Sequence, residues 1–102
     1  MDRKLINRRY RIERKIGEGA AAEVYLAQDS VLNRKVALKS LRPQFAADPG
    51  FRMRFEREAQ AAARFNHPNI IAIFDVGEDR GLPYIVMEYV DGETLRTIID
   101  QE

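Results

Sequence analysis

The sequence predicts an α+β fold in which a twisted five-stranded antiparallel sheet carries one long helix packed on it. Three observations predict this fold. Short apolar runs of β-type composition, separated by glycine or asparagine, fill residues 10–39. A stripe of apolar residues at helical spacing follows over 51–65. Two further apolar runs, 70–76 and 82–90, flank a polar turn. With 102 residues, of which 45% are hydrophobic, the chain is long enough for one small domain and too short for two.

The first three strands are expected to form an antiparallel meander. Tyr10, Ile12 and Ile16 all fall on even positions, an alternation typical of a strand with one buried face. Gly17 and Gly19 then interrupt the first strand. The other two strands and the turn between them are predicted over 24–27, 36–39 and 33–34.

The helix is predicted from its start signal and its apolar stripe. Asp48 is a good N-cap, and Pro49 suits the first helical position, where its missing N–H costs nothing. Asn66 and Pro68 are expected to end the helix. The stripe consists of Phe51, Phe55, Ala59, Ala62 and Phe65.

A hairpin is expected after the helix, with polar residues 78–81 as its connection. Leu95, Ile98 and Ile99 then begin an amphipathic helix that stops within two turns, at Glu102. A helix that ends as its apolar face develops predicts an interrupted domain. The predicted division is a basic lead over 1–9 and a domain over 10–102.

Composition and charge argue against several classes of function. The 17 basic and 16 acidic residues leave a net charge of +1, so nucleic-acid and membrane-surface binding are not expected. The absence of cysteine excludes disulfides and thiol chemistry, and a single histidine, His67, makes a zinc site or a Ser-His-Asp triad improbable. We expect no metal site. With no signal-like N-terminus and no run of about 18 apolar residues, a cytoplasmic location is expected.

The segment 16–24 is a glycine-rich loop between two strands. Gly17 and Gly19 let the backbone approach a ligand without a Cβ, and three alanines keep the tip small, which suits a phosphate group. A tight hairpin without any ligand would have the same composition. A dinucleotide-binding fold would need a helix directly after the glycines, and Val24 begins a strand-like run instead.

Lys39 and Glu58 form a candidate pair of opposite charges. Lys39 ends the third strand, and Glu58 borders the apolar stripe of the helix. The alternatives are an edge lysine in solvent and a charge flanking the stripe. A strand lysine below a glycine loop, held by a helix glutamate, would aim its ammonium at nucleotide phosphates. In that arrangement Lys39 is expected to be exposed in a cleft.

Together these segments resemble the eukaryotic-type protein kinases. The glycine-rich segment ending at Val24, the strand 36–39 and Glu58 match the pattern of that family. Segments 66–70 and 84–90 resemble its helix-to-strand loop and its hinge. The combination most similar to bacterial Ser/Thr kinases of the receptor type is 57–60, 67–69 and 87–92.

The resemblance covers roughly residues 8–102 and implies roles for the loop and the charged pair. Gly17 and Gly19 would cover the phosphates of ATP, with Ala22 at the third glycine position of the family. That departure should stiffen the loop slightly without blocking it. Lys39 would contact the α- and β-phosphates, and Glu58 would hold Lys39.

The resemblance also implies how the adenosine would bind. Val24 and Ala37 would lie over the adenine, with Met87 behind it as gatekeeper. The backbone of Glu88 and Val90 would read the adenine edge. The complete nucleotide set implied is Ile16, Gly17, Gly19, Ala22, Val24, Ala37, Lys39, Met87, Glu88, Val90 and Asp91, the last near a ribose hydroxyl.

The implied function is the ATP-binding small lobe of a Ser/Thr protein kinase. The family's His-Arg-Asp loop and Asp-Phe-Gly motif, which supply the base and the magnesium ligands, do not occur in these 102 residues. We therefore expect this chain alone to be inactive and to bind ATP weakly, with magnesium and protein substrates relevant only to the complete kinase. The alternative is a natural non-catalytic module that pairs with full-length kinases as a dimerisation or decoy lobe.

The resemblance further implies a homodimer through the back of the lobe. Arg9 could pair with Asp75 of a second subunit, and a two-fold interface would use that pair twice. Leu32 would supply an apolar anchor in a turn that is otherwise polar. The alternative is that Leu32 is one of many scattered exposed apolar residues and that the two charges are solvated.

Overall fold

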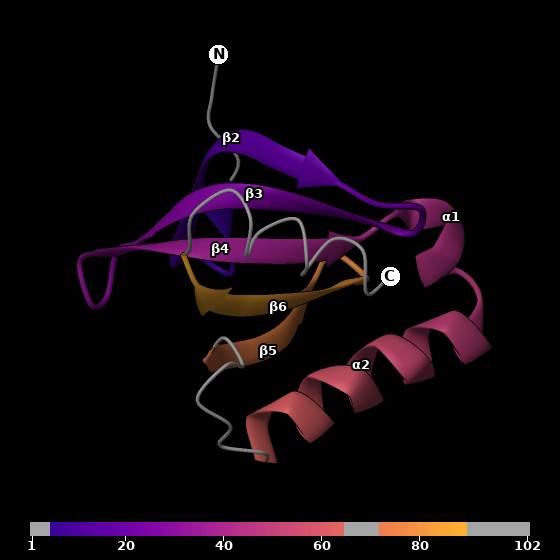
Figure 1. Cartoon of the computed structure of the whole chain (residues 1–102). Helices are drawn as coiled ribbons and strands as arrows, with labels where there is room; N and C mark the ends of the chain where they lie inside the picture. Colours follow the sequence, from indigo (N-terminus) through magenta and orange to yellow (C-terminus); the bar gives the residue numbers. More distant parts are fainter. Residues whose placement is uncertain (1–4, 65–71, 90–102) are drawn as a thin grey trace.

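The computed structural model of the chain describes residues 5–64 and 72–89, and side chains up to residue 57 and from 72 to 89. The elements are β1 (Leu5–Ile6), β2 (Tyr10–Glu18), β3 (Ala22–Asp29), β4 (Arg34–Leu41), α1 (Pro43–Ala46), α2 (Pro49–Arg64), β5 (Ile73–Asp79) and β6 (Leu82–Glu88). The strands form one antiparallel sheet in the order β1-β2-β3-β4-β6-β5 (Figure 1). The predicted α+β class and the single long helix on the sheet are confirmed.

The sheet has six strands among the described residues, one more than predicted. The additional strand is β1, in which Ile6 pairs with Tyr10 across the three-residue turn 7–9. Within this turn Asn7 and Arg8 have φ values of 49° and 58°. Left-handed backbone at two non-glycine residues is uncommon, and for this reason a turn within the basic lead was not predicted.

Two loop boundaries also differ from the prediction. Strand β2 continues through Gly17, which pairs with Val24, so only Gly19 to Ala21 lie between β2 and β3. Strand β5 continues to Asp79, so the β5–β6 connection is the two-residue turn Arg80–Gly81 rather than four polar residues. Both turn residues have positive φ, 54° and 82°, as a tight hairpin requires.

The long helix begins where its cap predicts. Pro49 is its first residue, and the Asp48 carboxylate accepts a hydrogen bond of 2.8 Å from the Gly50 amide. Phe51 and Phe55 pack toward the sheet as expected. Three predictions fall outside the described residues: the helix end at Asn66 and Pro68, the stripe residue Phe65, and the further helix of Leu95, Ile98 and Ile99. His67 also lies outside them. Ala59 and Ala62 lie in α2, but their side chains are not among those described.

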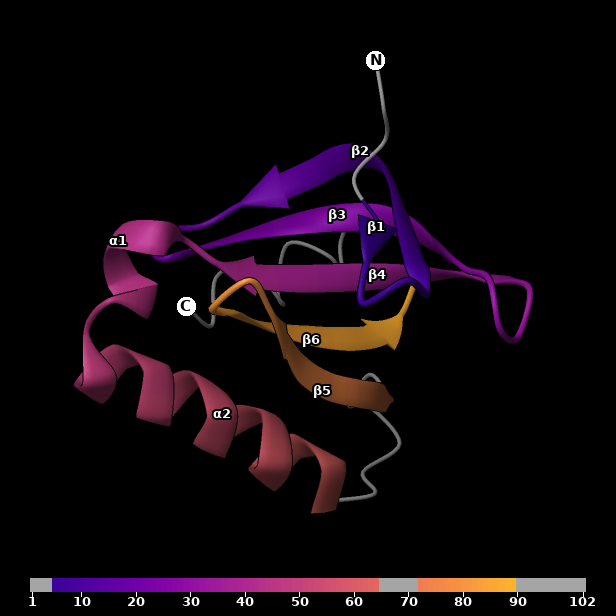
Figure 2. The same cartoon turned by 180° about the vertical axis from the view of Figure 1, so that it is seen from behind.

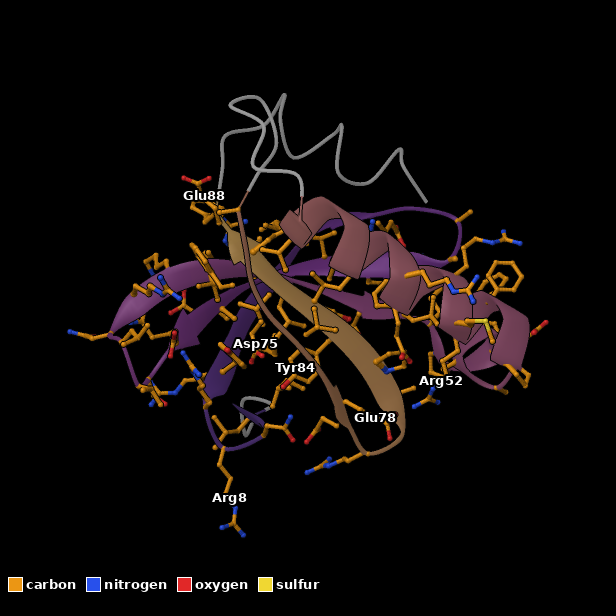
Figure 3. The ribbon with its side chains drawn as sticks, turned by 90° about the horizontal axis from the view of Figure 1, so that it is seen from below. Arg8, Arg52, Asp75, Glu78, Tyr84 and Glu88 are labelled. Atoms are coloured by element: carbon orange, nitrogen blue, oxygen red, sulfur yellow. The ribbon has the colours of Figure 1, made fainter. Side chains whose placement is uncertain are left out.

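Helix α2 runs beside β5 and β6 (Figures 1 and 2). Arg52 fastens its first turns to the hairpin, because its guanidinium donates to the Gly81 carbonyl at 2.9 Å and pairs with the Glu78 carboxylate. Figure 3 shows Arg52 beside the hairpin and Glu78 near the turn of the hairpin. The short helix α1, which was not predicted, contributes buried Ala46 to the same core.

The sheet separates two cores. We call the side of the sheet that carries α1 and α2 the outer face. Its core, the outer cluster, consists of Ala21, Ala22, Val24, Ala37, Leu41, Ala46, Phe55, Ile85 and Met87. The opposite side is the inner face, and its core consists of Ile6, Tyr10, Ala27, Val36, Leu38, Tyr84 and Val86. The sheet curls around the inner face until the β1–β2 turn meets the β5–β6 hairpin, where the Asn7 amide donates to Asp79 and its side chain donates to the Glu78 carbonyl.

Candidate functional site

Lys39 lies at the centre of the outer face. It pairs with Val24 of β3 on one side and with Ile85 of β6 on the other, and both belong to the outer cluster with Phe55 of α2. Side chains alternate along a strand, so Lys39 shares its face with Ala37 and not with Leu38. The structure therefore places Lys39 on the face that carries the helix.

The expected exposure of Lys39 is wrong. The residue is only 5% exposed, because β4 is an internal strand with β3 and β6 on either side. Buried lysines are rare unless they are paired. Residue 58 lies in α2 three positions after buried Phe55, on the same side of the helix. The side chain of Glu58 is outside the described part of the chain, so the Lys39–Glu58 pair stays a prediction.

Several residues implied for the nucleotide come together around Lys39. Ala22, Val24, Ala37 and Met87 are buried in the outer cluster, and Ile16 packs against it. Ala37 and Met87 are paired across β4 and β6. Apart from Lys39 these side chains are apolar, and most of them are small. The outer face thus combines one buried cation with buried apolar side chains.

The hinge residues are described only in part. Glu88 is exposed at the end of β6, and its amide donates to the Ala72 carbonyl at 3.0 Å. Figure 3 shows Glu88 at the opposite end of the hairpin from Glu78. Val90 and Asp91 lie outside the described residues. Their roles therefore stay predictions.

A charged network that the sequence did not predict borders the glycine-rich segment. Lys15 pairs with Glu18 and Glu23 at 3.2 and 2.8 Å, and Arg42 pairs with the same two carboxylates at 2.8 and 3.6 Å. The hydrogen bond from Arg42, followed by that from Lys15, lowers the pKa of Glu18, and the bond from Lys15 lowers the pKa of Glu23. No local pattern links Arg42 to residues some twenty positions earlier, so only the fold reveals this contact.

The residues predicted for a dimer already have partners within the chain. The Arg9 guanidinium donates two hydrogen bonds of 2.9 Å to the fully buried Asp29 carboxylate. Asp75 accepts a hydrogen bond of 2.8 Å from the Tyr10 hydroxyl. Leu32 is 56% exposed in the β3–β4 turn. The Arg9–Asp75 pair between subunits remains a prediction that would have to coexist with these internal bonds.

A cavity of about 280 Å³ opens on the inner face and does not coincide with the predicted nucleotide residues. Its walls include Tyr25, Leu38 and Ser40, which alternate along β3 and β4 with Val24, Ala37 and Lys39. Among the described side chains, no three metal-ligating residues lie close enough together to hold an ion. Within the same part of the chain, no helix is long and apolar enough to cross a membrane.

Comparison with known proteins agrees with this architecture. Residues 10–102 match the family model described as the protein kinase domain. The Ser/Thr protein kinase PrkC of Bacillus subtilis is 53% identical over 96 residues, and PknB of Mycobacterium tuberculosis is 53% identical over 98 residues. These matches cover 94% and 92% of this chain but only 15% and 16% of the length of the two kinases.

Solved structures give the same result. The kinase domain of PknI from Mycobacterium tuberculosis, as a double mutant, superimposes with a TM-score of 0.75 at 42% identity and covers 90% of this chain and 37% of its own. A structure described as the apo form of PpkA-294 gives a TM-score of 0.77 at 26% identity over 100% of this chain and 42% of its own. The chain therefore belongs to the protein kinase family and has the fold of the small lobe, most similar to the lobes of bacterial Ser/Thr kinases.

Proposed function

We propose that this chain is the ATP-binding lobe of a kinase that transfers the γ-phosphate of ATP to Ser or Thr in proteins. The observation that carries the proposal is the position of Lys39, buried among apolar side chains on the face that also bears α2. An ammonium held in an apolar environment acts strongly on phosphate charge. The family match and the Ser/Thr kinase relatives support the same reading.

In this proposal one set of residues contacts the phosphates of the nucleotide and another set contacts its adenosine. Gly17 and Gly19 lie over the phosphates, and Lys39 neutralises the α- and β-phosphate charge. Val24 and Ala37 cover one face of the adenine. Met87, the backbone of Glu88 and Val90, and Asp91 complete the contacts to the adenosine. Magnesium would be held by groups of the complete kinase, since the family's metal-binding motif does not occur in this chain.

The chain by itself should not transfer phosphate. Phosphoryl transfer depends on positioning and on charge neutralisation by metal ions, and the base and metal motifs are absent from the sequence. One lobe also covers only about half of a nucleotide, whereas ligand sites usually bury about 70–90% of the ligand surface. We expect a Kd for Mg-ATP of roughly 1 mM, which corresponds to about 4 kcal/mol of binding free energy.

The test is a titration of the chain with Mg-ATP, followed by NMR or calorimetry, together with a phosphate-transfer assay. Lys39→Met should abolish the weak binding. Lys35→Met is the matched control, because Lys35 lies on the same strand and the same face but is exposed and pairs with Glu13. Equal loss of binding in both variants, or phosphate transfer by the chain alone, would contradict the proposal.

We also propose that two lobes associate through the exposed turn that carries Leu32. Leu32 and its neighbour Val31 are 56% and 65% exposed, and both interrupt a polar turn. Sedimentation should show a monomer–dimer equilibrium that Leu32→Asp shifts toward monomer. Val31→Asp introduces the same charge one residue away and serves as the control. If the two variants have the same effect, or if Leu32→Asp has none, the dimer model is wrong.

A further inference from the structure

The turn between β2 and β3 is built almost entirely from backbone. It is closed by a hydrogen bond of 2.9 Å from the Gly19 amide to the Ala22 carbonyl. Between these residues the side chains of Ala20 and Ala21 are only methyl groups. The turn therefore has few interactions of its own that could fix the direction of its peptide groups.

Arg42 supplies those interactions from the end of β4. Its backbone amide donates to the Ala21 carbonyl at 2.8 Å, and its Nη2 donates to the Gly19 carbonyl at 3.1 Å. The same Nη2 donates to the Glu18 carboxylate at 2.8 Å. Arg42 is therefore bonded to both ends of the Gly19–Ala21 stretch.

The position of Arg42 is itself fixed. Its carbonyl accepts the amides of Phe45 and Ala46 at 3.0 and 2.9 Å, which starts α1. The Arg42 side chain is 23% exposed, and its Nη1 lies 3.6 Å from the Glu23 carboxylate. The arginine is thus anchored by a helix start on its backbone and by two carboxylates on its side chain.

Peptide geometry links these contacts to the direction in which the turn presents its amides. The described residues contain no cis peptide bond, and in a trans peptide the C=O and the N–H point in opposite directions. When Arg42 holds the Gly19 carbonyl, the N–H of Ala20 must point away from Arg42. Within the described part of the chain, that N–H donates to no acceptor.

We propose that Arg42 is a positioning residue for phosphate binding: it holds the Gly19 and Ala21 carbonyls back, so that the Ala20 amide is available to a phosphate oxygen of the nucleotide. This inference rests on the proposed function, and it adds a residue to which the sequence assigned no role. Backbone amides that are oriented before the ligand arrives bind anions without a further ordering cost.

Lys15 provides a matched comparison within the same network. It pairs with the same carboxylates, Glu18 and Glu23, and carries the same charge, but it donates no hydrogen bond to the backbone of the turn. A purely electrostatic role would make Lys15 and Arg42 equivalent. A positioning role belongs to Arg42 alone.

The experiment compares the wild-type chain with Arg42→Met and Lys15→Met by NMR titration with ADP and with adenosine, which lacks phosphates. Arg42→Met should weaken ADP binding by about tenfold, the effect of one lost hydrogen bond to a charged group, and change adenosine binding by less than about twofold. Lys15→Met should change the affinity for ADP by less than about threefold. Arg42→Lys keeps the charge but not the fork of donors, so it should resemble Arg42→Met.

Two results would overturn the inference. One is an ADP affinity that is the same in Arg42→Met as in the wild type, or reduced equally for ADP and adenosine. The other is an unchanged rate of amide hydrogen exchange at Gly19, which should rise in Arg42→Met and not in Lys15→Met. If the wild-type chain binds neither ligand, the proposed function fails, and the exchange rate at Gly19 still decides whether Arg42 holds the turn.

Discussion

The inner and outer faces of this sheet are built from different kinds of side chain. On the inner face, the rings of Tyr10 and Tyr84 meet edge to face with centroids 6.0 Å apart, and both hydroxyls are hydrogen-bonded. The outer face around Lys39 has small or aliphatic side chains, including Val24 and Ala37. The inner face thus combines hydrogen-bonded aromatic rings with an open cavity, whereas the outer face packs small and aliphatic side chains against the helices.

The two faces meet in a single strand. Leu38 and Lys39 are neighbours in β4, and both are buried, but they belong to opposite faces. In the proposed function the nucleotide binds on the outer face, whereas the inner face has only a structural role. Substitutions of adjacent residues should therefore have different effects.

The largest difference in stability is expected between these two neighbours. Leu38→Ala removes a side chain that is 1% exposed and should lower the free energy of unfolding by about 2–5 kcal/mol. Lys39→Met replaces a buried cation with an apolar side chain of similar length, so it leaves no cavity and should lower the free energy of unfolding by less than Leu38→Ala does. Urea unfolding of both variants measures this contrast. A greater loss of stability in Lys39→Met would reverse the assignment of the two faces.

A second test concerns the buried carboxylate at the end of the inner face. Hydrogen bonds from Arg9, followed by those from the amides of Leu32 and Val31, lower the pKa of Asp29 against the opposing effect of burial. A carboxylate whose pKa is lowered by folding stabilises the folded state fully at any pH above its pKa in the unfolded chain, which is about 3.8 for Asp29. This stabilisation is lost as the pH falls toward the lower pKa of the folded state.

Asp29→Asn should accordingly lower the free energy of unfolding at pH 7 by about 2–3 kcal/mol. It should also make stability less dependent on pH below about 4, since the titrating carboxylate is gone. Glu18→Gln is the control, because Glu18 also has a lowered pKa but is exposed. Thermal unfolding between pH 7 and pH 2.5 would refute this account if Asp29→Asn kept the wild-type slope.

The close packing of the inner face predicts an effect at a glycine. A Cβ at Gly77 would lie 2.7 Å from the Tyr84 hydroxyl oxygen, and Asn7 hydrogen-bonds that hydroxyl. Gly77→Ala should therefore destabilise the chain by about 1–3 kcal/mol. Gly50→Ala, in the first turn of α2, should cost less, because alanine favours the helix and its Cβ would lie 3.2 Å from only the Asp48 carboxylate oxygen, at the end of a side chain. Similar melting temperatures for the two variants would show that the Tyr84 ring can move aside.

The smallest expected effect comes from a single hydroxyl. Burial, followed by the hydrogen bond to Asp75, raises the pKa of Tyr10. Tyr10→Phe removes that bond and should cost about 1 kcal/mol of stability. Tyr25→Phe removes a hydrogen bond to Glu23, which keeps Lys15 as a partner, and should cost less. The order of these two losses in urea titrations checks whether the inner face depends on its buried hydroxyls.

The sequence predicted the features that depend on local signals. The start of α2 was correct because Asp48 and Pro49 define it within three residues. Strands β3 and β4 were located by composition alone. The family resemblance named Val24, Ala37 and Met87 together, and the structure places all three in one cluster.

The features that were missed depend on contacts between distant residues or on unusual backbone. Strand β1 requires positive φ at Asn7 and Arg8, for which neither residue type is a strong signal. The burial of Lys39 follows from its pairing with Ile85, which is 46 positions later in the chain. The contact of Arg42 with the turn has the same origin, because β4 must first pair with β3.

Nucleotide binding by the outer face is tested most directly by a residue-by-residue NMR map of the chain titrated with Mg-ATP. Chemical shifts should change at Gly17, Gly19, Val24, Ala37 and Lys39, and all of these changes should saturate at one weak affinity. The inner-face residues Ala27, Val36, Leu38 and Val86 should not shift, although they belong to the same strands. Changes centred on the inner face, or none at the glycine-rich turn and Lys39, would contradict it.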